Sequence, residues 1–213
     1  EFLSGTLVLK SNIDLHLEKG AVLISSLNEE DILDFAKLFE DDNACTGWDG
    51  GCFLFACHEK NITISGEGTI YGQGDKVFFD DNADGGYHEC PLNVAAFRPR
   101  TTFFEDVENL TVRDITFKDA AFWTLHMVGC REVSVLDIKI LNDVRGANND
   151  GIDPDCCKDV IIRGCMIKTG DDAIVIKTTK PMSERYGAAE NIVISDCILC
   201  SHDSALKIGS ETH

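Results

Sequence analysis

Short segments of alternating apolar and polar residues recur along the chain. Each segment begins with a polar residue, alternates apolar with polar positions, passes a Gly or Asp, and ends in a second short apolar run. The segments are Asn61–Ile70, Asn109–Phe117, Glu132–Ile140, Asp159–Ile167 and Asn191–Leu199. An apolar period of two, interrupted by turn residues every few positions, predicts short strands rather than helices.

These segments form an irregular repeat. Their first apolar positions lie 48, 23, 27 and 32 residues apart, at Ile62, Leu110, Val133, Val160 and Ile192. Short strands with a period in the twenties are typical of a solenoid, so the fold class that fits best is all-β, a parallel β-helix. The signature of leucine-rich repeats is absent. Hairpin turns of the Asn-Gly type do not punctuate the strands, which argues against an antiparallel sandwich.

Loop insertions explain the uneven spacing of the repeat. Two of them are Arg145–Asn148 and Thr178–Glu190. The longest spacing corresponds either to about two coils or to one coil that carries a long excursion. The segment Gly72–Cys90 is rich in Gly, Asp and Asn, and this composition predicts a long loop.

The N-terminal part continues the strand pattern over Thr6–Leu17 and Ala21–Ser25, and only Glu29–Phe39 predicts a helix. We expect a single β-helix domain over residues 1–213 that lacks its C-terminal coils. The sequence stops at His213, just after a core strand, where a solenoid needs a cap. We expect either that the native protein continues there or that another chain covers this end. Self-association through it is one form of the latter.

A second strand follows each of the last repeat strands, and the four align residue by residue. The aligned runs are Trp123–Met127, Asp150–Pro154, Asp172–Ile176 and Ser204–Ile208. One inward ladder is then Leu125, Ile152, Ile174 and Leu206, and a second is Met127, Ile176 and Ile208. Because neighbouring side chains alternate sides, an outward face is predicted for His126, Asp153, Val175 and Lys207.

Three aspartates meet at the entrance of these aligned strands. Asp150 and Asp172 share one column on adjacent coils, and Asp171 lies beside Asp172. Adjacent coils are about 4.8 Å apart, so these carboxylates are close enough to raise one another's pKa. A glycosidase needs two carboxyl groups, roughly 6.5–9.5 Å apart for inversion and about 5–5.5 Å apart for retention. The alternatives are aspartates that cap coil corners and a calcium site.

The composition disfavours several classes of binding partner. The formal net charge is −18, from 37 acidic and 19 basic residues, which disfavours nucleic acid and anionic membranes. No run of about 18 apolar residues suggests a membrane span. The Cys positions and His spacing lack a zinc pattern, and Cys165 and Cys197 occupy matching repeat positions that favour stacked, buried thiols. We therefore expect no metal and no cofactor.

Localisation stays open on the sequence. The sequence shows neither an initiator methionine nor a signal peptide. Ten cysteines kept as thiols would indicate a reducing interior, which allows a cytoplasmic location, or an anaerobic organism.

The two acidic motifs, Asn148–Asp153 and Gly170–Ile174, resemble the signature of the polygalacturonase family of pectin hydrolases, glycoside hydrolase family 28. Similarity to bacterial members extends over Gly5–Asn12, Leu17–Val22, Gly66–Gly74 and Phe122–His126. The resemblance implies a right-handed parallel β-helix, inverting hydrolysis without a cofactor, a polysaccharide or oligosaccharide partner, and secretion or a periplasmic location. It also implies that Asp171 is the general acid and that Asp150 and Asp172 position and activate the water.

The chain departs from the family pattern in two places. Ser204 occupies the column position where the family has a histidine, and His202 lies two residues earlier, in a run that favours a surface turn. The sequence also ends before the family's later Arg-x-Lys pair could appear. The residues considered for substrate binding are His126, Asp153, Lys177, His202 and Lys207. Trp123 is either a sugar-stacking platform or a core residue.

Two other functions fit the same scaffold. A polysaccharide lyase would use calcium and a basic residue, but no Arg or Lys lies within the aspartate run itself. A non-catalytic carbohydrate-binding β-helix or adhesin would bind sugars without releasing reducing ends. The paired acidic motifs favour the hydrolase.

Overall fold

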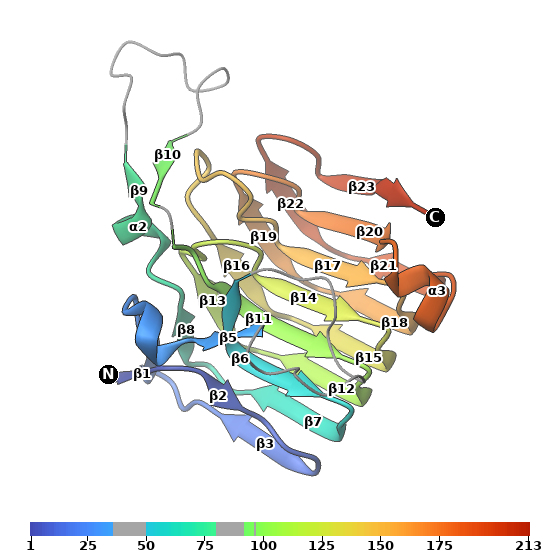
Figure 1. The fold of residues 1–213 in the computed structure, drawn as a ribbon, viewed down its shortest axis with the longest axis horizontal. Coiled ribbons are helices and arrows are strands. Elements are labelled where there is room, and N and C mark those ends of the chain that lie inside the picture. Colours follow the sequence, from blue (N-terminus) through green and yellow to red (C-terminus); the bar gives the residue numbers. More distant parts are fainter. Residues whose placement is uncertain (36–49, 80–91, 96) are drawn as a thin grey trace.

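Three parallel sheets form the faces of a right-handed parallel β-helix (Figure 1). The computed structural model describes residues 1–35, 50–79, 92–95 and 97–213. One sheet contains β1 (Phe2–Ser4), β4 (Val22–Ser25), β8 (Thr69–Tyr71), β13 (Thr116–Lys118), β16 (Lys139–Leu141), β19 (Met166–Thr169) and β22 (Ile198–Ser201). The predicted fold class is confirmed.

The second and third sheets complete each coil. The second contains β2 (Leu7–Val8), β6 (Gly51–Cys57), β11 (Arg100–Glu105), β14 (Leu125–Val128), β17 (Ile152–Asp155), β20 (Ile174–Thr178) and β23 (Leu206–Thr212). The third contains β3 (Ile13–His16), β7 (Lys60–Ser65), β12 (Glu108–Arg113), β15 (Arg131–Leu136), β18 (Lys158–Arg163) and β21 (Glu190–Ser195).

The register of the third sheet explains the longest spacing of the repeat. Ile62 on β7 pairs directly with Leu110 on β12, so the intervening residues belong to one coil with a long excursion. Leu110 pairs with Val133, Val133 with Val160, and Val160 with Ile192. All five positions that the sequence pattern treats as equivalent are therefore paired.

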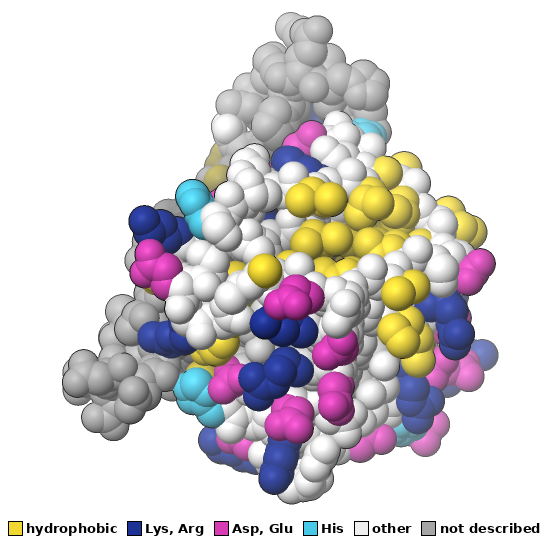
Figure 2. Space-filling view, turned by 90° about the vertical axis from the view of Figure 1, so that its right-hand side faces the viewer, with side chains coloured by type: hydrophobic (Ala, Val, Ile, Leu, Met, Phe, Trp, Pro, Cys, Tyr) yellow, Lys and Arg dark blue, Asp and Glu magenta, His cyan; other side chains and the backbone are white. Residues whose placement is uncertain are grey.

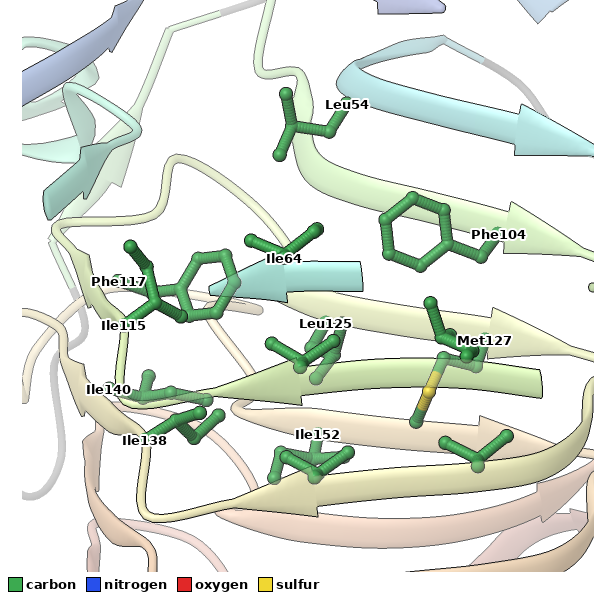
Figure 3. Close-up of a cluster of buried hydrophobic side chains, with 14 of the residues drawn as sticks. Leu54, Ile64, Phe104, Ile115, Phe117, Leu125, Met127, Ile138, Ile140 and Ile152 are labelled. Carbon is green, nitrogen blue, oxygen red and sulfur yellow. The ribbon is translucent and has the colours of Figure 1, made fainter. Parts of the chain in front are cut away.

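The core is a set of stacked apolar columns. Leu125 pairs with Ile152 and Ile152 with Ile174, and all three are fully buried. Ile174 pairs with Leu206 on the last coil, which confirms the first predicted ladder. Figure 3 shows Leu125 and Ile152 inside the coil, with Phe104 and Met127 farther along their strands. Each such buried side chain contributes roughly 1.5–3 kcal/mol.

Polar residues at the coil corners adopt left-handed backbone conformations. One corner in each of five coils has a φ near +55°, at Asn61, Asn109, Glu132, Asp159 and Asn191. The next corner is Gly66, Asp114, Asp137, Gly164 or Asp196, all with positive φ. Asn, Asp and Gly tolerate this conformation best, so the Gly or Asp corner of the sequence pattern has a conformational cause.

The helix predicted over Glu29–Phe39 is wrong over Glu29–Asp34, whereas Phe35, the last described residue of the range, is helical. Glu29–Asp31 is a 3-10 turn, and Leu33–Asp34 forms β5, which pairs antiparallel with β6. The Thr6 hydroxyl accepts a 2.8 Å bond from the backbone N–H of Leu33. Tertiary pairing to the neighbouring strand therefore overrides the local helical preference. Residues 36–39 lie outside the described residues.

Two predicted loops contain short elements. The Gly72–Cys90 segment includes α2 (Gly74–Val77) and β9 (Phe78–Phe79), which pairs with β10 (Asn93–Val94); residues 80–90 are outside the described ranges. The Thr178–Glu190 insertion includes α3 (Met182–Tyr186), whose Tyr186 hydroxyl donates a 2.7 Å bond to buried Glu105.

Eight cysteines lie in the described ranges and none of these forms a disulfide, while Cys45 and Cys90 are not described. Burial raises the pKa of the Cys165 thiol to about 12, and the neighbouring Cys197 contributes to the shift. This proximity agrees with the predicted stacking of the two thiols. Within the same ranges, no helix has the length and apolarity that crossing a membrane requires.

Candidate active site

Three carboxylates converge where β17 and β20 begin. One carboxylate oxygen from each of Asp150, Asp171 and Asp172 lies within 4.8 Å of the other two. The backbone fixes this arrangement, because Gly151 N–H donates to Asp172 O at 2.9 Å across adjacent coils. The predicted column of Asp150 and Asp172, with Asp171 beside it, is therefore present.

Asn149 joins the two acidic motifs. Its side-chain oxygen accepts bonds from the backbone N–H groups of Gly170 at 2.7 Å and Asp171 at 3.2 Å. Its amide nitrogen donates to Asp143 O at 2.6 Å, and its own carbonyl accepts from Asn142 Nδ2 at 2.8 Å. Asn149 is fully buried. Its hydrogen bonds therefore fix the position, along the axis of the β-helix, of the turn that contains Asp171 relative to Asp150.

Glycines allow the two motifs to approach closely. A Cβ at Gly151 would lie 2.4 Å from Ala173 O, and one at Gly170 would lie 2.4 Å from Gly146 O. Either contact is too short for a real side chain, so both positions need glycine for the coil spacing that brings the carboxylates together.

Asp150 and Asp172 each keep one oxygen available inside the site. Asp150 is 3% exposed and Asp172 is 2% exposed, yet Oδ1 of each has no hydrogen-bond partner among the described residues. Buried polar atoms are normally satisfied, so unsatisfied oxygens here favour a bound water or ligand. Water donates to carboxylates at about 2.8 Å, and one carboxylate oxygen of each residue lies within 4.8 Å of the other, a separation that one molecule can bridge.

The site environment favours protonated carboxyl groups. Burial, together with the charges of Asp171 and Asp172, raises the pKa of Asp150 to about 7, although Lys177 opposes the shift. Burial also raises the pKa of Asp171, and the charges of Asp172 and Asp203 add to the effect. Asp171 is half-buried, so among the three it is the carboxyl group best able to reach a bound substrate.

Two lysines lie near the cluster but differ in surroundings. Lys207 Nζ is 2.9 Å from Asp172 Oδ2 and 3.7 Å from Asp203 Oδ2. Lys177 is 6% exposed, and its Nζ lies 3.3 Å from Glu211 Oε2. Burial lowers the pKa of Lys177, but the charges of Asp153, Glu211 and Asp150 outweigh it and raise the pKa overall.

His126 and Asp153 do not line an open cleft as the alternation predicted. They are paired on adjacent strands, as expected, but both are fully buried. The rings of Phe103 and Trp123 lie edge-on to His126, with ring centroids 5.0 and 4.7 Å away. An aromatic layer therefore packs against the outside of this sheet, and the period-two pattern contains no sign of it.

Burial and the charge of Asp150 raise the pKa of Asp153 well above its ordinary value. Neither carboxylate oxygen of Asp153 has a hydrogen-bond partner among the described residues. A protonated Asp153 behind Asp150 limits the negative charge in the interior.

Trp123 is half-buried and already packed by other groups. Phe122 stacks on it with centroids 5.4 Å apart, and the Lys177 ammonium and the Arg100 guanidinium lie 4.9 and 5.3 Å from its ring centroid. This environment favours a structural role for Trp123 over a sugar-stacking platform.

His202 lies half-buried in the turn between β22 and β23, and Ser204 follows it. The carbonyl of Ser204 accepts a 2.8 Å bond from Ala173 N–H, which places Ser204 next to Asp172 in the column. The next coil therefore contributes a hydroxyl side chain at the position where the resemblance implies a histidine.

The same three carboxylates have the oxygen spacing that suits a hard divalent cation. Their environment already includes the Lys207 ammonium and raised pKa values at Asp150 and Asp171. Both features reduce the negative charge available to a metal, so the arrangement is better suited to proton transfer.

The family model for glycosyl hydrolases family 28 matches residues 42–213. The chain belongs to this family. Among its relatives, the endo-polygalacturonase of Pectobacterium carotovorum subsp. carotovorum is 31% identical over 224 residues, covering 99% of this chain and 52% of that protein. An exopolygalacturonase of Arabidopsis thaliana is 27% identical and covers 74% of this chain and 33% of its own length. This chain therefore spans between a third and about half of the length of these relatives.

Solved structures share the fold. An exopolygalacturonase from Thermotoga maritima superimposes with a TM-score of 0.75 at 24% identity, over 99% of this chain and 53% of that structure. The family 28 exopolygalacturonase of Yersinia enterocolitica gives a TM-score of 0.78 at 19% identity, over 99% and 43%. These similarities agree with the parallel β-helix, and all three aspartates lie inside the residues that the family model matches.

Sequence reasoning missed the residues that hold the candidate site in place. Asn149 lies within the first acidic motif, so its position next to Asp150 was the available signal. Asn142 gave none, because its contacts to Ala120 N and Thr124 Oγ1, at 2.9 and 2.8 Å, cross coils. Arg98 likewise reaches Ala147 O at 2.6 Å from a distant part of the sequence.

Proposed function

We propose that this chain is a glycoside hydrolase that cleaves glycosidic bonds of pectic or related plant cell-wall polysaccharides. The convergence of Asp150, Asp171 and Asp172 carries the proposal, because acid and base catalysis at one bond needs carboxyl groups in different protonation states. Family 28 membership supports the substrate class. The polygalacturonase names of the relatives agree with it.

Asp171 is the proposed general acid. It is the most accessible of the three carboxyl groups, and burial keeps its pKa raised, so it can hold a proton and donate it to the leaving oxygen. Asp150 and Asp172 are the proposed water-binding pair, since one carboxylate oxygen of each lies within 4.8 Å of the other. Water attack from this pair would invert the anomeric centre, as the family resemblance implies, with carboxylates closer together than the roughly 6.5–9.5 Å of most inverting pairs.

Release of reducing ends tests the activity. Purified protein is incubated with polygalacturonate, other pectic polymers and neutral glycans, and reducing ends are measured. Asp171→Asn should lower the rate by at least about 10³-fold without unfolding the protein, whereas the exposed corner variant Asp196→Asn should retain the wild-type rate. The anomer formed first, observed by NMR, should be inverted. Full activity of Asp171→Asn would refute the acid assignment.

A calcium-dependent lyase is the second candidate, favoured by the oxygen spacing of the three carboxylates. It predicts unsaturated sugar ends that absorb in the ultraviolet and loss of activity on chelation. Hydrolysis predicts neither, so absorbance measured with and without a chelator separates the two reactions. A non-catalytic binding module would release no products of either kind.

We also propose self-association through the last described coil. Its exposed apolar side chains are Val193 at 55%, Ile198 at 64%, Leu206 at 53% and Ile208 at 74%. In Figure 2 hydrophobic side chains gather in one area, while basic and acidic side chains alternate along another. Sedimentation should detect an oligomer that Ile198→Lys dissociates. A wild-type monomer at all concentrations would overturn this proposal.

A further inference from the structure

Lys207 brings a positive charge into direct contact with one of the three aspartates. Lys207 lies on β23, which pairs with β20, the strand that follows Asp172. Its Nζ donates to Asp172 Oδ2 at 2.9 Å. That contact occupies Oδ2 of Asp172, whereas Oδ1 is buried and has no hydrogen-bond partner among the described residues. Only one of the two oxygens of this carboxylate is therefore held by a described group.

The other cation near the site is held elsewhere. Lys177 is buried, its Nζ lies 3.3 Å from Glu211 Oε2, and the charges of Asp153, Glu211 and Asp150 raise its pKa. Lys207 is 31% exposed in its side chain. Its hydrogen bond to Asp172, with the charges of Asp172 and Asp203, raises the pKa of the Lys207 ammonium, so it stays charged throughout the neutral range.

We propose that Lys207 is a positioning residue that fixes the orientation of the Asp172 carboxyl group, rather than a residue that binds the substrate. The proposal rests on the proposed hydrolase function. The hydrogen bond to Oδ2 restrains rotation of the carboxyl group, so Oδ1 keeps one position relative to Asp150.

The charges around Asp172 come from four elements. Asp150 approaches from the preceding coil, Asp171 from the same turn, Asp153 from β17, and Lys207 and Asp203 from the following coil. Four of these five groups are acidic. Lys207 is the cation of this set, and it contacts Asp172 directly.

Kinetics of three variants test the proposal. In Lys207→Met, kcat should fall by about 10-fold or more with KM changed less than about 2-fold. Lys207→Arg, which keeps the charge, should restore part of kcat. Lys10→Met, which removes a 3.1 Å ion pair to Glu59 in a distant coil, is the matched control. A raised KM with unchanged kcat would show substrate binding instead and overturn the proposal.

A second measurement does not depend on catalytic activity. The ¹⁵N signal of the Lys207 ammonium should titrate above ordinary lysines in the wild type and return toward them in Asp172→Asn, with circular dichroism confirming the fold. An unchanged titration would overturn the Lys207 proposal. Absence of reducing ends on every glycan would instead overturn the proposed function, so the two failures are distinguishable.

Discussion

The Asn149 side-chain oxygen accepts the backbone N–H of Asp171 at 3.2 Å, and also that of Gly170 at 2.7 Å. One buried amide thus fixes the distance along the axis of the β-helix between the turn that contains the proposed acid, Asp171, and the coil that contains Asp150. The relationship joins two motifs that are separate in the sequence.

Asn149→Ala should impair both folding and catalysis. It leaves the backbone N–H groups of Gly170 and Asp171 without their partner and removes one of the two bonds to the Asp143 carbonyl, so we expect the free energy of unfolding to fall by about 2–4 kcal/mol. A turn displaced by about 1 Å can reduce kcat by about 10²-fold. Urea denaturation and initial rates measure the two effects. Asn93→Ala, on the separate β9–β10 ribbon, is the control; equal losses in both variants would contradict the assignment.

Asp150→Asn should inactivate the protein and stabilise it near neutral pH. Burial raises the pKa of Asp150 from 3.8 to about 7 in the folded state, so the folded protein binds this proton more tightly than the unfolded chain. Unfolding is therefore favoured as pH rises from about 4 to 7. At about 1.4 kcal/mol for each pH unit between the two values, the cost reaches at most about 4 kcal/mol.

The stability gain in Asp150→Asn should consequently be near zero below pH 4 and largest above pH 7. Thermal melts of both proteins from pH 3.5 to 8 measure it. A gain that is constant across this range would show that the effect is not the removal of a titrating carboxyl group, and Asp196→Asn provides a surface aspartate for comparison.

Gly170→Ala should be strongly destabilising for a steric reason. The added Cβ would lie 2.4 Å from Gly146 O and 2.7 Å from Gly146 N, and backbone atoms cannot move aside as a flexible side chain can. We expect a loss of about 1–3 kcal/mol or more. Gly20→Ala is a useful comparison, because Gly20 has a φ of +86° but no atom within 4 Å of its would-be Cβ. Similar losses in both would indicate backbone conformation rather than crowding.

The repeat pattern predicted the strands, the register of the inward ladder and the meeting of the three aspartates, because each depends on a period-two alternation and on stacking of equivalent coil positions. Leu125, Ile152 and Ile174 follow this rule without exception. The pattern indicates which side of a strand a residue occupies, but it does not indicate what packs against that side.

His126 shows the consequence. It faces outward, as predicted, yet rings from Phe103 and Trp123 pack against it and it is fully buried. The helix prediction was wrong over Glu29–Asp34 for a related reason, since strand β5 forms by pairing with β6. Contacts between segments distant in the sequence decide both cases, and local periodicity carries no information about them.

The corner position of Glu132 offers a stabilising substitution. Glu132 adopts a φ of +54°, a conformation that costs most residues roughly 1 kcal/mol and that Asn tolerates better. In the preceding coils the same corner carries asparagines linked in a ladder, with Asn109 Nδ2 donating to Asn61 Oδ1 at 2.9 Å and Asn61 Nδ2 to Asn12 Oδ1 at 2.8 Å. Glu132→Asn would extend this ladder by one coil and also remove one negative charge from a chain with a net charge of −18.

We expect Glu132→Asn to raise the free energy of unfolding by about 0.5–1 kcal/mol, through relief of the left-handed conformation and one added side-chain hydrogen bond. Urea denaturation at constant pH measures the gain as a shift in midpoint without a change in slope. Glu108→Asn removes the same charge from an exposed position whose φ is not positive and which has no ion pair among the described residues, so it isolates the electrostatic part. If both variants gained equally, reduced charge repulsion alone would account for the effect, and the corner conformation would not limit stability.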